Sequence, residues 1–335
     1  GKLVSVPGLQ EAYYGELDVE NLGLVEARVA TYADLIFATW AEDAPSLEAY
    51  LGDARWYLDP SFNRLDSGTV AYGPMKWMEP SNWKTSVDNC SDNYHVAVSH
   101  YSSALVQARR GARLAGAVSH KTMFENPSKH LFVNGHALTF RVVDEGEPRS
   151  SHGVSDQNIE MFKEYQKATQ AEAERRLGNL RSRMQLGNHS LFPNGVLGFR
   201  LSQPRGPFMT EFWHFAVVES DLPEGLKRDL RVGSQGNNGA AGMFEQDDQD
   251  NWIQVTHASR STLGRKYPQY LVMGAGHSGS HPDYPGDVSE RYISESNQRN
   301  FYARWQEFMN ADSWKDIHID PITAKFEGSA TQMGS

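Results

Sequence analysis

Hydrophobic and polar residues follow two different periods along this chain. A period of two, with many β-branched and aromatic residues, predicts strands at residues 29–40, 69–78, 131–143, 184–192, 196–202 and 210–219. A helical period predicts helices over most of residues 81–106, over 156–177, from about 222, and over 288–309. Strands that follow one another as hairpins, with helices between the groups, favour an α+β fold in which helices cover one face of an antiparallel sheet.

The composition limits the possible partners. The chain has 335 residues, enough for one large domain and a small appendage. Its formal net charge of -10 disfavours nucleic acid and anionic membranes as partners, because both bind clustered cations. The sequence has neither a long apolar run nor a secretion leader, and its single cysteine excludes an internal disulfide. We therefore expect a protein of the reducing cytoplasm without a membrane span.

Asp92, His95 and His100 form a D-x2-H-x4-H cluster, the strongest chemical signal in the sequence. Two imidazoles and a carboxylate favour Fe, Cu, Ni or Zn over Mg or Ca. On an ideal helix, at about 100° per residue, Asp92 and His95 share a face, whereas His95 and His100 diverge by roughly 140°. A π-bulge or an unwound turn would be needed to aim both imidazoles at one ion. In the alternative interpretation Asp92 caps a helix and the histidines are ordinary surface or core residues.

Several motifs around this cluster occur in a characteristic order. They are Pro-Ser-Asn-Trp-Lys at 80–84, the run 88–95, Asn-His-Ser-Leu-Phe-Pro-Asn at 188–194, the run 239–248, and Asn-Trp at 251–252. The sequence resembles, over nearly its whole length, the large (alpha) subunits of Rieske-type aromatic-ring-hydroxylating dioxygenases. This resemblance implies a helix-grip (START-like) catalytic domain, an antiparallel sheet covered by helices.

The resemblance also implies a set of metal ligands. His95 and His100 match the two iron-binding histidines of the family, and Asp248 matches its carboxylate ligand. Together they would form a 2-His-1-carboxylate triad on Fe(II). Asp247 is the competing choice: if residues 242–259 are helical, Asp247 and Asp248 point about 100° apart, so only one of them faces the iron. The other should be solvated or pair with a neighbouring base.

Five further residues are candidates near the iron. Asp92 matches the acid that links an iron-bound histidine to a Rieske cluster ligand on the adjacent subunit, and it would accept the imidazole N–H. Asn89 matches an asparagine close to the iron. Val96, Met243 and Phe244 are neighbours of the ligands in sequence, and they are expected either to line a mostly apolar substrate pocket or to pack in the core.

The Rieske cluster is the main departure from the family pattern. A Rieske [2Fe-2S] centre needs two cysteines and two histidines, whereas this chain has only Cys90, which lies inside the iron motif. The chain cannot hold that cluster. Residues 1–45 resemble the tail of a Rieske domain whose cluster-binding part is missing, and residues 46–335 resemble the catalytic domain. The absence of an initiator Met fits a fragment.

The function that the resemblance implies is O2-dependent cis-dihydroxylation of an aromatic compound at a mononuclear Fe(II). Electrons would come from NAD(P)H through a reductase, usually a ferredoxin, and the Rieske cluster. A trimer of alpha subunits, with or without beta subunits, is expected. Two alternatives are a metal-free helix-grip ligand-binding module and a zinc hydrolase, in which Glu245 is the nearest candidate base in sequence.

Overall fold

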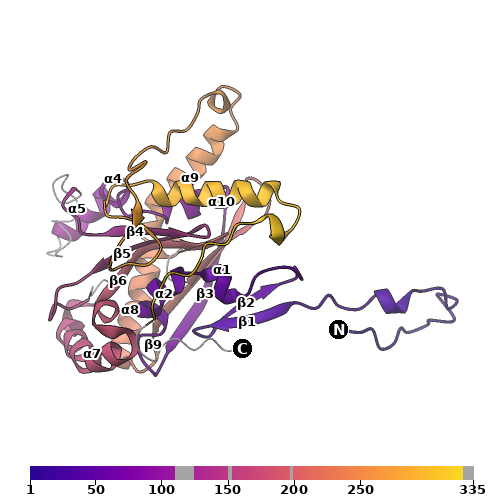
Figure 1. Cartoon of the computed structure of the whole chain (residues 1–335), viewed down its shortest axis with the longest axis horizontal. Coiled ribbons are helices and arrows are strands. Elements are labelled where there is room, and N and C mark those ends of the chain that lie inside the picture. Colours follow the sequence, from indigo (N-terminus) through magenta and orange to yellow (C-terminus); the bar gives the residue numbers. More distant parts are fainter. Residues whose placement is uncertain (110–123, 150–152, 197–198, 327–335) are drawn as a thin grey trace.

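An antiparallel sheet forms the centre of the molecule (Figure 1). The structure is a computed structural model and describes residues 1–109, 124–149, 153–196 and 199–326. Within these residues nine strands pair in the order β10-β11-β4-β5-β6-β7-β8-β9-β3. Their bounds are β3 (Thr69–Glu79), β4 (Lys129–Val133), β5 (His136–Val142), β6 (Met184–Leu191), β7 (Gly195–Val196), β8 (Phe199–Pro204), β9 (Thr210–Glu219), β10 (Gly279–Ser280) and β11 (Asp287–Ser289). The α+β prediction is confirmed.

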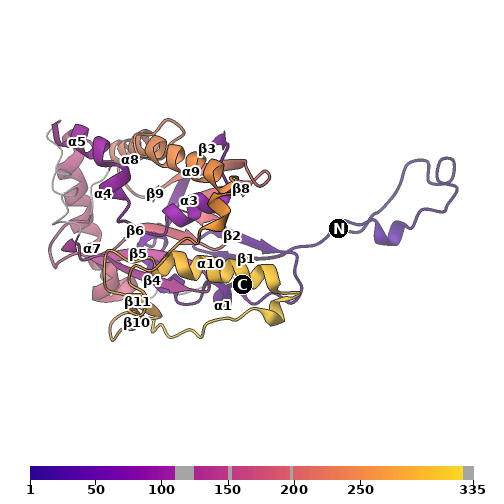
Figure 2. The ribbon, with the colours of Figure 1, turned by 90° about the horizontal axis from the view of Figure 1, so that it is seen from above.

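Helices cover both faces of this sheet. They are α1 (Leu47–Leu51), α2 (Ala54–Phe62), α3 (Trp83–Asn89), α4 (Val96–Ser99), α5 (Tyr101–Arg109), α7 (Ile159–Ser182), α8 (Glu224–Asn238), α9 (Glu245–Ser259) and α10 (Ser296–Asn310). Figure 1 shows α10 on one side of β4–β6, and α2 with α7 on the other, and Figure 2 looks down on the α10 side. The prediction that helices cover only one face was therefore wrong.

Two hydrophobic cores explain this arrangement. Below the sheet, Tyr57 and Leu58 of α2 pack against Leu138 and Phe140 of β5, all fully buried. Above it, Phe301 of α10 belongs to a second buried cluster, with Val87, Cys90, Phe192 and Val196. Since successive side chains of a strand point to opposite faces, a sheet with apolar residues on both sides must be covered on both sides.

Some predicted elements are divided differently in the structure. Residues 29–40 form a hairpin of β1 (Arg28–Tyr32) and β2 (Leu35–Thr39), turned by Ala33 and Asp34 at φ 47° and 62°. Residues 131–143 form the hairpin β4–β5, turned by Asn134 and Gly135, which also have positive φ. Positive φ at both central residues matches the twist of a tight hairpin. The predicted helix at 288–309 begins only at 296, because residues 287–289 form β11.

The N-terminal part of the chain stands apart from the large sheet. Residues 1–27 run as an arm away from the body, and β1–β2 pair only with each other (Figure 1). The Tyr32 hydroxyl anchors this hairpin by donating to Asp59 Oδ1 of α2 at 2.7 Å.

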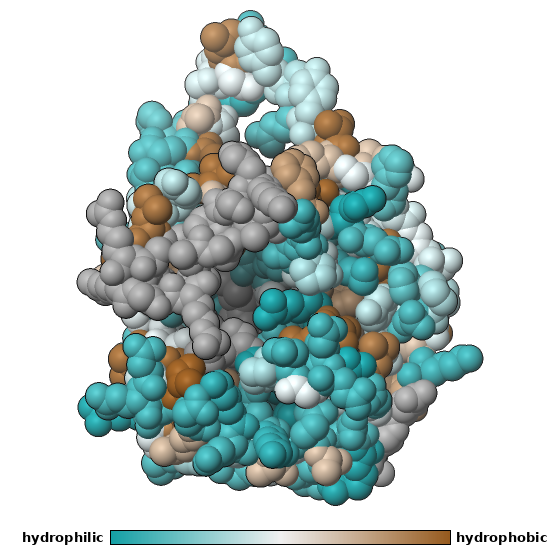
Figure 3. Space-filling view, turned by 90° about the vertical axis from the view of Figure 1, so that its left-hand side faces the viewer, coloured by the Kyte–Doolittle hydropathy of each residue, from teal (hydrophilic) through white to brown (hydrophobic). Residues whose placement is uncertain are grey.

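In the part of the chain that the structure describes, no helix is both long and apolar enough to cross a membrane. The side of the molecule that carries α4 and α5, on the left in Figure 1, is mostly hydrophilic where described residues form it (Figure 3).

Candidate metal centre

The predicted helix over 81–106 is interrupted where the histidines lie. Helix α3 begins after Asn82, whose side chain accepts a hydrogen bond from the Lys84 amide, and it ends at Asn89. The next helix, α4, has only four residues, with His95 immediately before it and His100 immediately after it. An irregular stretch at 90–95 therefore replaces the continuous helix that would have turned the two imidazoles apart.

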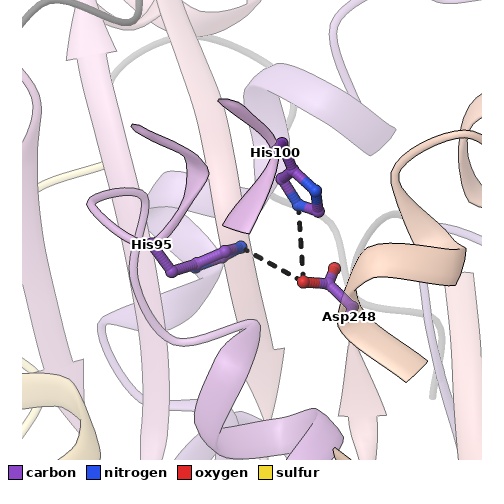
Figure 4. A group of neighbouring side chains, drawn as sticks. All are labelled: His95, His100 and Asp248. Carbon is purple, nitrogen blue, oxygen red and sulfur yellow. Dashed lines mark ion pairs between the residues drawn. The ribbon is translucent and has the colours of Figure 1, made fainter. Parts of the chain in front are cut away.

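His95, His100 and Asp248 converge on one point (Figure 4). Asp248 Oδ1 lies 3.4 Å from His100 Nε2 and 3.9 Å from His95 Nε2. One potential ligand atom from each residue lies within 4.8 Å of the other two. The histidines come from the two ends of α4 and the carboxylate from the first turn of α9, about 150 residues later in the sequence.

The electrostatics of this point favour a cation. Asp248 is 6% exposed, and its Oδ1 makes no hydrogen bond with the described residues. A buried carboxylate oxygen without a partner costs free energy unless a donor or a cation satisfies it. Burial lowers the pKa of His100, but the nearby Asp248 and Asp247 outweigh this effect and hold the pKa above its usual value. The cluster therefore attracts positive charge, and its donors are those that Fe(II) accepts.

Each histidine is oriented by a second carboxylate. Asp92 Oδ1 accepts from His95 Nδ1 at 3.0 Å and from the His95 backbone N at 3.0 Å. Asp247 Oδ2 accepts from His100 Nδ1 at 3.2 Å. Because an ionised carboxylate can only accept, these contacts place the proton of each neutral imidazole on Nδ1 and leave its Nε2 lone pair facing Asp248. Asp92 thus accepts from both the backbone and the ring of His95, so it fixes the turn before α4 and orients an imidazole.

Asp247 and Asp248 take different roles in this arrangement. Asp248 faces both imidazoles, whereas Asp247 pairs with one of them, His100, and also accepts from the Ser103 hydroxyl at 3.1 Å. The two carboxylates diverge because they are successive residues of α9. The geometry therefore favours Asp248 as the ligand.

Strand β6 fixes the loop that carries Asp92. The Asn188 side chain donates to the Asp92 carbonyl at 2.6 Å, and the Asn188 backbone N donates to Asn93 Oδ1 at 2.9 Å. A side chain at Gly187 would collide with the Asn93 amide and the Thr139 hydroxyl. The motif at 188–194 is recognisable in the sequence, but nothing local in it indicates that Asn188 anchors this loop.

A buried ion pair fixes helix α9. Arg200 on β8 makes a bidentate contact with Glu245, at 3.0 Å (Nη1–Oε1) and 2.7 Å (Nη2–Oε2), and donates to the Asn238 carbonyl at 2.8 Å. The two charged side chains are 0% and 1% exposed. Glu245 precedes Asp248 by three residues, so both lie on the same face of α9. Local sequence patterns gave no sign of this pair, whose members are 45 residues apart.

The remaining candidates lie around the same cluster. Asn89 Nδ2 is 3.4 Å from His95 Nε2, and the Phe244 ring is 5.0 Å from the His100 ring. Val96 and Met243 are half-buried. A largely apolar cavity of about 740 Å³ lies between the β1–β2 hairpin and the body of the molecule, but none of Val96, Met243 and Phe244 lines it. A pocket wall made by these three residues stays a prediction.

Comparisons with known proteins identify the family. A model of the ring hydroxylating alpha subunit (catalytic domain) matches residues 47–311. Biphenyl 2,3-dioxygenase subunit alpha of Rhodococcus jostii (strain RHA1) is 35% identical over 324 residues, which are 94% of this chain and 69% of the relative. Benzene 1,2-dioxygenase subunit alpha of Pseudomonas putida is 32% identical over 328 residues, 95% of this chain and 71% of the relative. The chain therefore belongs to the ring-hydroxylating dioxygenase alpha subunits.

The solved structures agree with this assignment. Naphthalene 1,2-dioxygenase with indole bound in its active site superposes with a TM-score of 0.81 at 29% identity, covering 95% of this chain and 72% of the other. This likeness extends the family assignment from sequence motifs to the arrangement of the sheet and its helices.

Proposed function

We propose that this chain carries out the oxygenase chemistry of an aromatic-ring dioxygenase, in which both atoms of O2 enter the ring and a cis-dihydrodiol forms. The observation that carries the proposal is the convergence of His95, His100 and Asp248 in a member of the ring-hydroxylating family. Relatives named for biphenyl and benzene support an uncharged aromatic compound as the substrate class.

The same three residues would hold a mononuclear Fe(II). The orphaned Asp248 Oδ1 and the two Nε2 atoms supply the donors that this ion takes in a 2-His-1-carboxylate site. Bound Fe(II) would supply the activation of O2, which amino-acid side chains cannot provide.

The residues around the ligands would position them. Asp92 and Asp247 hold the protons of His95 and His100 on Nδ1, so that each Nε2 is free to donate electrons to the metal. We propose that the Asn89 amide adds a polar contact beside His95, and that Val96, Met243 and Phe244 exclude water from an apolar substrate pocket.

Alpha subunits of this family work with a reductase and a ferredoxin and form oligomers with beta subunits. For this chain we propose that electrons pass from NAD(P)H through these proteins and a Rieske [2Fe-2S] cluster, which residues outside this chain would bind. Residues 1–45 would be the end of the Rieske domain and 46–335 the catalytic domain. In a trimer of alpha subunits, Asp92 would link this site to the neighbouring cluster. A cytoplasmic location stays a prediction.

The two alternatives lack comparable support. A zinc hydrolase would need Glu245 as a base, but the Arg200 guanidinium occupies both oxygens of this carboxylate in a buried ion pair. A metal-free binding module gives no reason for two Nε2 atoms to converge on the buried Asp248 Oδ1.

Metal binding and oxygen consumption test the proposal together. We expect the chain to bind one Fe(II), and His95→Ala or Asp248→Ala to abolish binding, whereas His277→Ala on an exposed loop should retain it. With NAD(P)H, reductase and ferredoxin, the chain should turn over negligibly, because it holds no cluster. Retention of iron by His95→Ala would refute the ligand set. Multiple turnovers by this chain alone would refute the electron route.

A further inference from the structure

The first turn of α10 is hydrogen-bonded to the segment that carries Asp92. Gln298 Nε2 donates to Asp92 Oδ2 at 2.7 Å, and Asn297 Nδ2 donates to the Ser91 carbonyl at 2.8 Å. One helical turn further on, the Tyr302 hydroxyl donates to Asp88 Oδ2 at 2.8 Å. Gln298 is 2% exposed and Asp92 is 3% exposed, so water does not compete for this contact.

Gln298 supplies the second side-chain donor to the Asp92 carboxylate. Oδ1 accepts from His95, and Oδ2 accepts from Gln298. The amide must present its nitrogen, because its oxygen would face a group that can only accept. With a donor on each oxygen, rotation of the carboxylate plane is restricted. Loss of the Gln298 donor would leave Oδ2 buried with no hydrogen-bond donor among the described residues, so that only the contacts of Oδ1 with His95 would orient the carboxylate.

We infer that Gln298 is a positioning residue: by fixing Asp92, it holds the proton of His95 on Nδ1 and aims Nε2 at the metal position before any metal binds. The inference deepens the proposed function, but its first readout does not depend on a metal. A purely structural role, in which Gln298 only ties α10 to the loop, would leave the protonation of His95 unchanged.

The experiment compares three variants of the whole chain. Gln298→Met keeps the size of the side chain but removes the donor, and Gln298→Leu removes the donor with a different apolar shape. Asn300→Leu is the matched control, because it removes an amide of the same helix that bonds to the His136 carbonyl instead. Circular dichroism checks that each variant is folded. If Gln298→Met does not fold, Gln298→Leu decides.

The first readout is the ¹⁵N spectrum of the histidine rings in metal-free protein above pH 7, with His95 assigned by its loss in His95→Gln. We expect His95 to carry its proton on Nδ1 in the wild type and in Asn300→Leu. In both Gln298 variants the proton should distribute between Nδ1 and Nε2. The second readout is Co(II) binding, which should weaken about 10-fold in both Gln298 variants, as is typical when the support of a ligand is lost.

The two readouts separate the inference from the proposed function. An unchanged His95 spectrum in the folded Gln298 variants would overturn the inference, even if the wild type binds Co(II). A shifted spectrum in a protein that takes up no Co(II) would uphold the positioning role and refute the metal site. A shifted spectrum together with weakened Co(II) binding would support both.

Discussion

The Arg200–Glu245 pair offers the sharpest test of how the structure holds the metal centre together. Arg200→Met removes the guanidinium and leaves the carboxylate of Glu245, the first residue of α9, buried without its partner. Removal of one partner of a buried ion pair typically costs about 3–5 kcal/mol. Burial already raises the pKa of Glu245, with Arg200 opposing that rise. Without Arg200 the carboxyl should take up a proton, which places the cost at the lower end, about 3 kcal/mol.

The double variant Arg200→Met, Glu245→Gln should recover much of this loss. It removes both charges, so no uncompensated charge stays buried, and neutral replacements of a buried pair are often tolerated. We expect the double variant to be more stable than Arg200→Met alone, with a coupling energy of about 2 kcal/mol between the two sites. Glu245→Gln alone completes the cycle.

Urea unfolding, followed by tryptophan fluorescence and far-UV circular dichroism, measures these free energies where the two transitions coincide. Co(II) binding to the same variants shows whether the position of Asp248 follows the stability of α9. A loss below 1 kcal/mol in Arg200→Met would refute the reasoning. So would strictly additive effects in the double variant, because they would mean that the two charges do not interact.

Three further predictions concern other carboxyl groups. Glu79 at the end of β3 is 3% exposed, and burial raises its pKa to about 8. The contribution of this carboxyl group to the stability of the fold is therefore fully present below its ordinary pKa. It is lost as pH rises towards 8, by about 1.4 kcal/mol per pH unit. Glu79→Gln should flatten this loss in urea unfolding between pH 5 and 8, and an unchanged slope would contradict the assignment. Asp247→Asn should weaken Co(II) binding about 10-fold through His100, whereas undiminished binding would show that Asp247 does not orient this ligand. Asp92→Asn, in an enzyme that includes the Rieske domain, should retain iron and substrate binding while coupled oxidation nearly disappears, and wild-type electron transfer in stopped-flow reoxidation would reject the bridging role.

The strands were the most predictable part of the fold. In β9 (Thr210–Glu219), predicted as a strand, buried and half-buried residues alternate along the whole element, as expected when successive side chains face opposite sides of a sheet. The hairpin turn at Ala33 and Asp34 was harder to predict, because Ala33 is not a residue that favours a positive φ and no glycine follows Asp34. The second hairpin has the Asn134–Gly135 pair, a stronger turn signal that a continuous-strand interpretation overlooked.

The helix predictions failed where tertiary contacts decide the backbone. Residues 81–106 have helical periodicity, yet residues 90–95 leave the helix, because Asn188 and Asn93 bond this loop to β6. A local pattern cannot report a partner about 95 residues away. For the same reason, the sequence raised the choice between Asp247 and Asp248 without deciding it.

Two strands and one helix therefore determine the geometry of one small site. Strand β6 holds the loop of Asp92, helix α10 holds its carboxylate through Gln298, and strand β8 holds α9 through Arg200. The helix α4 between the histidines has only four residues and cannot by itself be stable. The orientation of the imidazoles must then come from the sheet and from α10 rather than from local helix formation. Substitutions of these distant anchors should consequently weaken metal binding while the histidines and Asp248 stay intact.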